Sequence, residues 1–211
     1  MRSSVVKSGS QKNTPESESY ERRMRFHVMP FLYKTSYGSH KKTMEEMLSS
    51  FNNIHMLDIS CGSGICGKII DNSNAVTGID ISFPMLKSAL YSLESEISVF
   101  NPVRGDAMKL PFKDGTFGLV TSSLGLHFMS DMNKAIKEVF RVMRSGALFV
   151  CSVPVMESGI FVDAYWNYYY KKGRFNPPIF EDDIIAACLS IGLKYKQICK
   201  KGKLLYFTAE K

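Results

Sequence analysis

Hydrophobic residues along the chain recur first at helical spacing and then in short strand-like runs. Between Tyr20 and about residue 50, apolar side chains return every three or four positions, which predicts N-terminal helices over 20–52. The apolar run 54–60 follows and ends at glycines, which is typical of a buried strand. The chain therefore changes from helical to strand periodicity near residue 54.

From that point on, strands and helices alternate. The pattern predicts further strands over 75–80, 99–104, 117–122 and 146–153, and helices over 65–70, 84–93 and 132–143. The last of these helices is strongly amphipathic, with Ile136 and Val139 on its apolar face. Strands that alternate with helices at this spacing predict a parallel α/β sheet.

The C-terminal part follows a different pattern. A helix over 180–191 is followed by strands over 193–198 and 204–209, with only Cys-Lys-Lys-Gly-Lys between them. So short a connection can join only antiparallel strands. We therefore expect a doubly wound, seven-stranded sheet that is mostly parallel and ends in a C-terminal antiparallel hairpin.

Composition is that of one globular domain. The chain has 211 residues, of which 45% are hydrophobic and 22% charged, and this excludes wholesale disorder, a collagen-like repeat and a coiled coil. Residues 1–19 are polar and predict a disordered N-terminal tail, which leaves 20–211 as the domain. No apolar run approaches the ~20 residues that span a bilayer, and no signal-peptide core is present, so a cytoplasmic location is expected.

Two further features bear on partners. The five cysteines are odd in number and lack paired metal-ligand spacing, so we expect reduced thiols and no metal site. The formal net charge is +7, with lysines and arginines gathered toward both ends of the chain. This charge permits an acidic partner such as RNA, but solvated surfaces explain it more simply.

The segment Gly62-Ser-Gly-Ile-Cys-Gly67 is a candidate ligand-binding motif. It matches G-x-G-x-x-G between a predicted strand and a predicted helix, where glycines let the backbone approach a ligand. Asp80 stands at the end of the next strand, where a carboxylate can accept from both hydroxyls of a ribose. The pattern predicts a nucleoside-containing cofactor; the alternative is a packing turn followed by a solvent-facing acid.

Several segments in order resemble the motifs of one family. They are Leu57-Asp-Ile-Ser-Cys-Gly-Ser-Gly64, Gly78-Ile-Asp-Ile-Ser82, 104–112, 114–117 and 135–153. Together they resemble class I S-adenosylmethionine-dependent methyltransferases, above all the ubiquinone/menaquinone-biosynthesis type (methyltransferase type 11). The resemblance implies a Rossmann-like fold, the cofactor S-adenosyl-L-methionine with S-adenosyl-L-homocysteine as its product, and a substrate-cover segment over 154–180.

The same resemblance implies a set of cofactor contacts. Asp58 would accept from the ammonium group of the cofactor, Asp80 from the ribose hydroxyls, and Asp106 from the exocyclic amine of adenine. The other implied contacts are Ser60, Gly62 and Gly64 along the methionine and ribose, Ile81 and Met85 on the adenine ring, Ala107 through its N–H, and Ser123 at the methionine end.

Candidates for catalysis and substrate binding lie later in the chain. His127 follows the fourth strand, where it could act as a general base or serve only in loop packing. The aromatic residues Tyr165, Trp166 and Tyr169 fall in the implied substrate cover, and they predict either an aromatic-lined pocket or a helix packed on the core.

These observations favour transfer of a methyl group to a small molecule, aromatic or amphiphilic in character, by in-line displacement. Three alternatives stay open. The basic charge suggests a tRNA or RNA methyltransferase, and a degenerate relative would be a cofactor-binding partner without catalysis. An NAD-dependent oxidoreductase also carries G-x-G-x-x-G, but the long helical region before the first strand, Asp58 and the antiparallel hairpin weigh against it. The sequence specifies neither the acceptor atom nor the oligomeric state.

Overall fold

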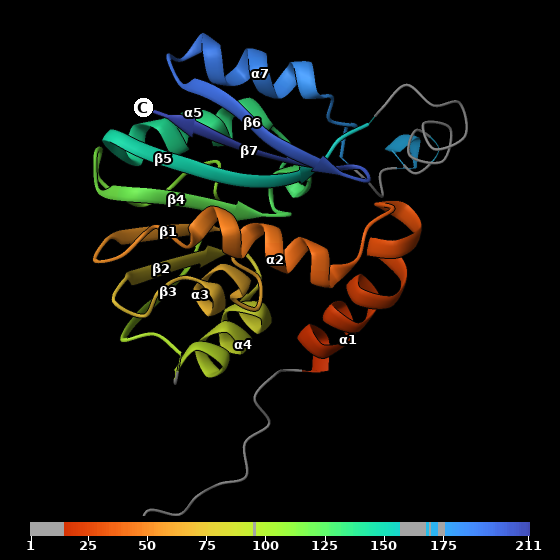
Figure 1. Ribbon diagram of the computed structural model, residues 1–211, viewed down its shortest axis with the longest axis horizontal. Coiled ribbons are helices and arrows are strands. Elements are labelled where there is room, and N and C mark those ends of the chain that lie inside the picture. Colours follow the sequence, from red (N-terminus) through yellow and green to blue (C-terminus); the bar gives the residue numbers. More distant parts are fainter. Residues whose placement is uncertain (1–14, 95, 157–167, 169, 173–175) are drawn as a thin grey trace, which may run out of the picture.

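The computed structural model describes residues 15–94, 96–156, 168, 170–172 and 176–211. Its centre is a seven-stranded sheet with the order β3-β2-β1-β4-β5-β7-β6 (Figure 1). The strands are β1 (His55–Ile59), β2 (Ala75–Asp80), β3 (Val99–Arg104), β4 (Phe117–Ser123), β5 (Met143–Pro154), β6 (Lys194–Lys201) and β7 (Leu204–Glu210).

The pairing of the strands confirms the predicted sheet. β3, β2, β1, β4 and β5 pair in parallel, whereas β7 pairs antiparallel with both β5 and β6. Strand β5 begins at Met143 rather than at the expected residue 146. Its pairing with β4 is irregular there, because Phe117 opposes Met143 and Leu119 opposes Leu148.

Helices cover both faces of the sheet. They are α1 (Pro15–Arg23), the π-helix η1 (Met24–Leu32), α2 (Tyr37–Leu48), α3 (Ile65–Ile69), α4 (Phe83–Leu93), the 3-10 helix η2 (Leu126–Phe128), α5 (Met132–Val142) and α7 (Glu181–Ser190). Helices α5 and α7 pack on one face, and η1, α2, α3 and α4 lie on the other (Figure 1).

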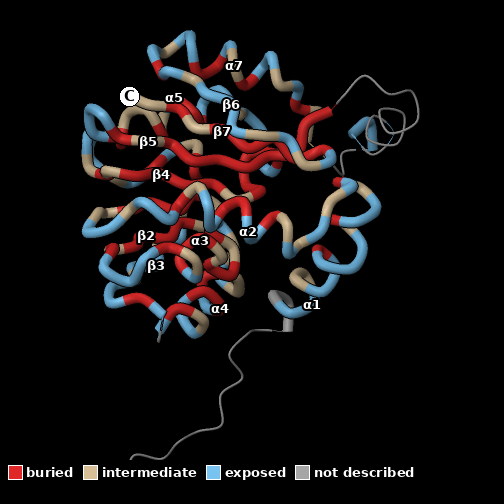
Figure 2. The backbone as a smooth tube through the Cα atoms, in the orientation of Figure 1, coloured by how far each residue is buried: buried red, intermediate tan, exposed pale blue. Residues whose placement is uncertain are grey.

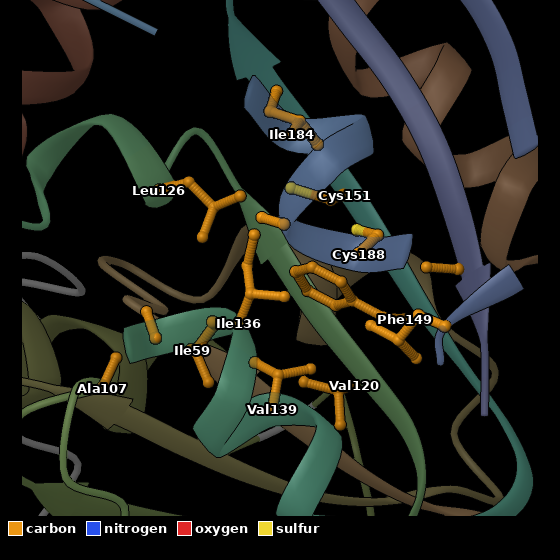
Figure 3. Packing of buried hydrophobic residues seen from close by; sticks show 14 of the residues in the cluster. Ile59, Ala107, Val120, Leu126, Ile136, Val139, Phe149, Cys151, Ile184 and Cys188 are labelled. Carbon is orange, nitrogen blue, oxygen red and sulfur yellow. The ribbon is translucent and has the colours of Figure 1, made fainter. Parts of the chain in front are cut away.

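Alternation along the strands divides the core into two clusters, one on each face. Figure 3 shows the first, in which Ile136 and Val139 of α5 and Cys188 of α7 meet Phe149 of β5. The second cluster joins methionines and leucines of η1 and α2 to the opposite side of the strands, where Tyr206 of β7 is fully buried. Buried residues accordingly run along the middle of the sheet (Figure 2).

The N-terminal helical region differs from the sequence prediction at its start. Helix α1 begins at Pro15, so residues 15–19 are helical rather than part of a disordered tail. Proline is well suited to the first turn of a helix, because the N–H that it lacks has no partner there. The helical region is also divided, since a break after η1 precedes α2, whose N-cap Ser36 accepts from the Ser39 N–H at 3.0 Å.

Candidate functional site

The candidate site lies at the edge where the parallel strands end. The strand order reverses between β1 and β4, and ligands of open α/β sheets bind at such a switch point. The loops after β1, β2, β3 and β4 all reach this edge, and Figure 1 shows α1 on the same side of the sheet.

Two cavities lie among these loops. The larger, about 360 Å³, is lined by Tyr20, Glu21, Met24, Tyr37, His40, Ser60, Cys61, Gly62, Ser63, Ile65, Asp80, Ile81, Met85, Ser123, Leu124 and Phe128. The smaller, about 120 Å³, is lined by Ser60, Ile79, Asp80, Ile81, Gly105, Asp106, Ala107, Met108, Phe128 and Met129. Because Ser60, Asp80, Ile81 and Phe128 line both, the two cavities adjoin, and together they are called the cleft below.

The glycine loop is shaped by packing as well as by its place in the cleft. Gly64 caps α3 in the left-handed region, with φ +85°, and a Cβ atom there would lie 2.8 Å from Cδ1 of Leu93. A Cβ on Gly67 would collide with the same leucine at 2.8 Å. These two glycines therefore let α3 approach α4 closely, while Gly62 lines the larger cavity.

Asp80 is held in one orientation by backbone donors. Its Oδ2 accepts from the Gly62 N–H at 2.9 Å, and its Oδ1 accepts from the Ser82 N–H at 2.9 Å. Each carboxylate oxygen keeps further lone pairs, and the residue lines both cavities. The carboxylate is thus fixed between the glycine loop and the smaller cavity, where it can accept two more hydrogen bonds.

Asp106 and Ala107 line the smaller cavity, as the resemblance implied. Helix α5 positions their loop, because Arg141 donates to the Leu110 carbonyl at 2.9 Å and to the Phe112 carbonyl at 2.7 Å. Glu138, also on α5, holds the same loop by accepting from the Leu110 N–H at 2.8 Å. The hydrogen bond from Arg141 lowers the pKa of the Glu138 carboxyl.

Asp58 lies beneath the cleft rather than among the residues that line it. Its side chain is buried and accepts from the Thr121 hydroxyl at 2.9 Å. Burial raises the pKa of this carboxyl to about 7, against the opposing effect of hydrogen bonds from Thr121 and Cys66. Its contact with the cofactor ammonium, directly or through water, stays a prediction.

His127 is buried in η2 and lines neither cavity, although its neighbour Phe128 lines both. Its Nε2 lies 3.3 Å from the Tyr33 hydroxyl, and its Nδ1 has no partner among the described residues. Burial lowers the pKa of this imidazole to about 3, so the ring is neutral near pH 7. Its role as a general base stays a prediction. Tyr165, Trp166 and Tyr169 lie outside the described residues.

The N-terminal helices form a wall of the larger cavity that the sequence did not predict. Glu21 of α1 accepts from the hydroxyl of Ser63 in the glycine loop. His40 of α2 is fully buried and lies in hydrogen-bond contact with Tyr206 and Ser123. One signal was available, since His40 stands four residues before the buried Met44 and thus on the apolar face of its helix.

The charge of the cleft is acidic. Glu21, Asp80 and Asp106 line it, whereas its described lining contains no lysine or arginine. Across the part of the chain that the structure describes, no group of three or more histidine, cysteine or acidic residues could hold a metal ion. No helix in these described ranges has the length and apolar character needed to cross a membrane.

Comparisons with known proteins agree with this geometry. Residues 57–151 match the family model described as a methyltransferase domain. A demethylmenaquinone methyltransferase of Lactiplantibacillus plantarum is 34% identical over 147 residues, which cover 65% of this chain and 62% of that protein. Another from Staphylococcus aureus is 35% identical over 147 residues, covering 66% and 58%. The match thus spans about three-fifths of the length of these relatives.

Solved structures show the same fold. YcgJ from Bacillus subtilis superposes with a TM-score of 0.69 at 21% identity, covering 77% of this chain and 71% of that one. An S-adenosylmethionine-dependent methyltransferase from Mesorhizobium loti superposes with a TM-score of 0.63 at 18% identity, covering 81% and 96%. These superpositions confirm the Rossmann-like α/β fold, and the match of residues 57–151 to a methyltransferase domain confirms the resemblance.

Proposed function

We propose that this protein is an S-adenosylmethionine-dependent methyltransferase that transfers a methyl group to a small molecule by in-line displacement. The observation that carries the proposal is the placement of Asp80, whose two oxygens are oriented by backbone N–H groups and which lines both adjoining cavities of the cleft. The match of residues 57–151 to a methyltransferase domain supports the same conclusion.

The residues along the cleft suit the chemical groups of the cofactor. Asp80 would accept from the ribose hydroxyls, and Asp106 at the far end of the smaller cavity would accept from the adenine amine. Ile81 lines both cavities with 71% of its surface exposed, so its side chain is available to pack on the adenine ring. Ser123 and Glu21 line the larger cavity, where they would contact the amino-acid end of the cofactor.

When bound, S-adenosylmethionine supplies a methyl group on a sulfonium, which is a good leaving group. The protein then contributes mainly alignment of the acceptor and exclusion of water. Tyr20, Met24, Tyr37 and Phe128 line the larger cavity beside Ser123, and they would cover an acceptor there.

This lining favours a small aromatic or amphiphilic acceptor. Aromatic and thioether side chains bind flat apolar groups well, and acidic neighbours disfavour a phosphate-bearing one. The relatives named demethylmenaquinone methyltransferases support the small-molecule class. An RNA substrate has less support, because the described lining of the two cavities holds the acids Glu21, Asp80 and Asp106 and no lysine or arginine.

Calorimetry with S-adenosylhomocysteine tests the cofactor assignment. Asp80→Ala should weaken binding more than tenfold, because a pre-oriented acceptor of ribose hydroxyls is lost. Asp182→Asn, an exposed acid in α7, should bind as the wild type does and serves as the control. Equal affinity of Asp80→Ala and wild type would refute the placement of the ribose.

Incubation with methyl-labelled S-adenosylmethionine and a fractionated cell extract then tests the acceptor. Label in the small-molecule fraction is expected. Label in RNA would replace the proposed substrate class, and cofactor binding without label in any fraction would favour a non-catalytic partner.

A further inference from the structure

Glu21 is an acidic side chain that the N-terminal helix α1 brings against the glycine loop. Its Oε1 accepts from the Ser63 hydroxyl, and both residues line the larger cavity. The residue before Ser63 in the loop, Gly62, donates its N–H to Asp80 at 2.9 Å. The carboxylate of Glu21 is therefore joined to the glycine loop next to the residue that holds the carboxylate proposed for the ribose.

The two cavities set the direction in which the cofactor would lie. Asp106 and Ala107, which are proposed for the adenine, line only the smaller cavity, whereas Asp80 lines both. A cofactor with its ribose at Asp80 and its adenine toward Asp106 would direct its amino-acid chain into the larger cavity. That chain carries an ammonium group, and charge-assisted hydrogen bonds make a carboxylate its strongest partner.

Glu21 has acceptor capacity to spare. A carboxylate offers about four lone-pair sites, and among the described residues the Ser63 hydroxyl is the one donor to Glu21. Arg22 and Arg25 border a separate cavity of about 200 Å³ beside Glu21, but within the described part of the chain no cation forms an ion pair with it. The side chain is partly buried, so a direct cationic partner stabilises it more than at a fully exposed position.

The other acidic residues near this end of the cleft are engaged elsewhere. Both oxygens of Asp80 accept from backbone N–H groups, and the remaining lone pairs are proposed for the ribose. Asp58 is only 2% exposed, lines neither cavity and accepts from the Thr121 hydroxyl at 2.9 Å. For an ammonium in the larger cavity, the accessible carboxylate is therefore that of Glu21.

Building on the proposed function, we propose that Glu21 is the direct carboxylate partner of the cofactor's ammonium group, with Ser63 holding the carboxylate in place. This assigns to α1 the contact that the sequence resemblance implied for Asp58. The residue lies outside the part of the chain that matches the methyltransferase domain, because α1 ends at Arg23 and the match begins at residue 57.

Three ligands separate the ammonium from the rest of the cofactor. S-adenosylhomocysteine carries an ammonium and a carboxylate, 5′-(3-carboxypropyl)thioadenosine lacks only the ammonium, and 5′-(3-aminopropyl)thioadenosine lacks only the carboxylate. In calorimetry, Glu21→Gln should weaken both ammonium-bearing ligands more than tenfold and change the affinity for the carboxypropyl ligand less than threefold. Equal losses for all three ligands would leave Glu21 with a structural role, and that result or no loss at all would overturn the proposal.

Glutamine suits this test because its amide oxygen can still accept from Ser63, so the variant removes the charge and keeps the hydrogen bond. Unchanged binding of the carboxypropyl ligand also shows that the variant is folded. Glu18→Gln is the matched control, since Glu18 is exposed on the same helix and does not line the larger cavity. It should bind all three ligands as the wild type does. A tenfold loss of the ammonium-bearing ligands in this control would indicate a general effect of charge on α1 and overturn the proposal.

Asp58→Asn decides between the two acids. It should keep the ratio of the affinities for S-adenosylhomocysteine and the carboxypropyl ligand within about threefold of the wild-type ratio. Loss of this ratio in Asp58→Asn, together with its retention in Glu21→Gln, would return the ammonium to Asp58 and overturn the proposal. A wild type that binds all three ligands equally would overturn it too, while leaving the cofactor assignment intact. A wild type that binds none of them would refute the proposed function itself.

Discussion

Gly202 joins the C-terminal hairpin to the N-terminal wall of the cavity. It lies in the turn between β6 and β7 with φ +60°, and the Lys203 N–H donates to the Tyr33 carbonyl at 2.8 Å. A Cβ atom on Gly202 would lie 2.2 Å from the Tyr33 oxygen and 2.4 Å from the Lys34 oxygen. Gly202→Ala should therefore push the segment between η1 and α2 away from the hairpin.

The expected loss of stability has two parts. A left-handed backbone costs a residue other than glycine about 1–2 kcal/mol. The collision adds to this cost because both opposing atoms belong to the backbone, so no side chain can rotate aside. Relief requires the turn and the segment to separate, which breaks the Lys203–Tyr33 hydrogen bond, worth about 1 kcal/mol, and loosens the packing around buried Tyr33. The total is about 3 kcal/mol.

Gly192→Ala is the matched control. Gly192 has φ +88° and no atom within 4 Å of its virtual Cβ, so the control carries only the backbone strain. Urea unfolding should place Gly192→Ala about 1 kcal/mol and Gly202→Ala about 3 kcal/mol below the wild type. Calorimetry should show weaker S-adenosylhomocysteine binding in Gly202→Ala alone. Identical stability and affinity in the two variants would refute the reasoning.

Three further predictions concern the rest of the molecule. Burial lowers the pKa of the His40 imidazole from its ordinary value of 6.5 to about 4, so the stability contributed by the neutral ring is complete above pH 6.5 and declines as the pH falls toward 4. Between pH 7.5 and 5, the free energy of unfolding of the wild type should thus fall by about 2 kcal/mol more than that of His40→Gln. The same difference in urea midpoint between the two proteins at both pH values would contradict this. Arg141→Met should lower the free energy of unfolding by about 2 kcal/mol, because Glu138 and two loop carbonyls lose their donor. It should also weaken S-adenosylhomocysteine binding. Unchanged affinity would show that the Asp106 loop keeps its position without Arg141. In urea unfolding, Ile136→Ala should lower the free energy of unfolding by about 3 kcal/mol and Ile136→Val by about 1 kcal/mol, since Ile136 is fully buried. Equal losses would show that neighbouring side chains move to fill the cavity.

The sheet could be predicted from the sequence because its signals are local. The central strands β1, β2 and β4 are short, largely buried runs, and only an antiparallel pair fits the short 199–203 connection. Asp80 and Asp106 could be placed for the same reason, since Asp80 ends β2 and Asp106 follows β3 by two residues, and both must lie near the edge where the parallel strands end.

The N-terminal wall could not be predicted in the same way. His40 contacts Tyr206 and Ser123, which are far away in sequence, and helical periodicity indicates only that His40 is turned inward. Local pattern also does not separate a buried acid below the cleft from one that lines it. Asp58 lies one residue before the end of β1 and Asp80 is the last residue of β2, yet only Asp80 borders the cavities.

The contact between α2 and β7 has a consequence for the order of folding. The His40–Tyr206 hydrogen bond joins residues 166 positions apart. A pairing at this separation carries a large loop-closure entropy, so it forms late, and during synthesis it must wait until β7 has left the ribosome. The glycine loop and Asp80 are thus complete early, whereas the wall that encloses a ligand beside them depends on the last strand of the sheet. A nascent chain should acquire its nucleoside affinity in one late step.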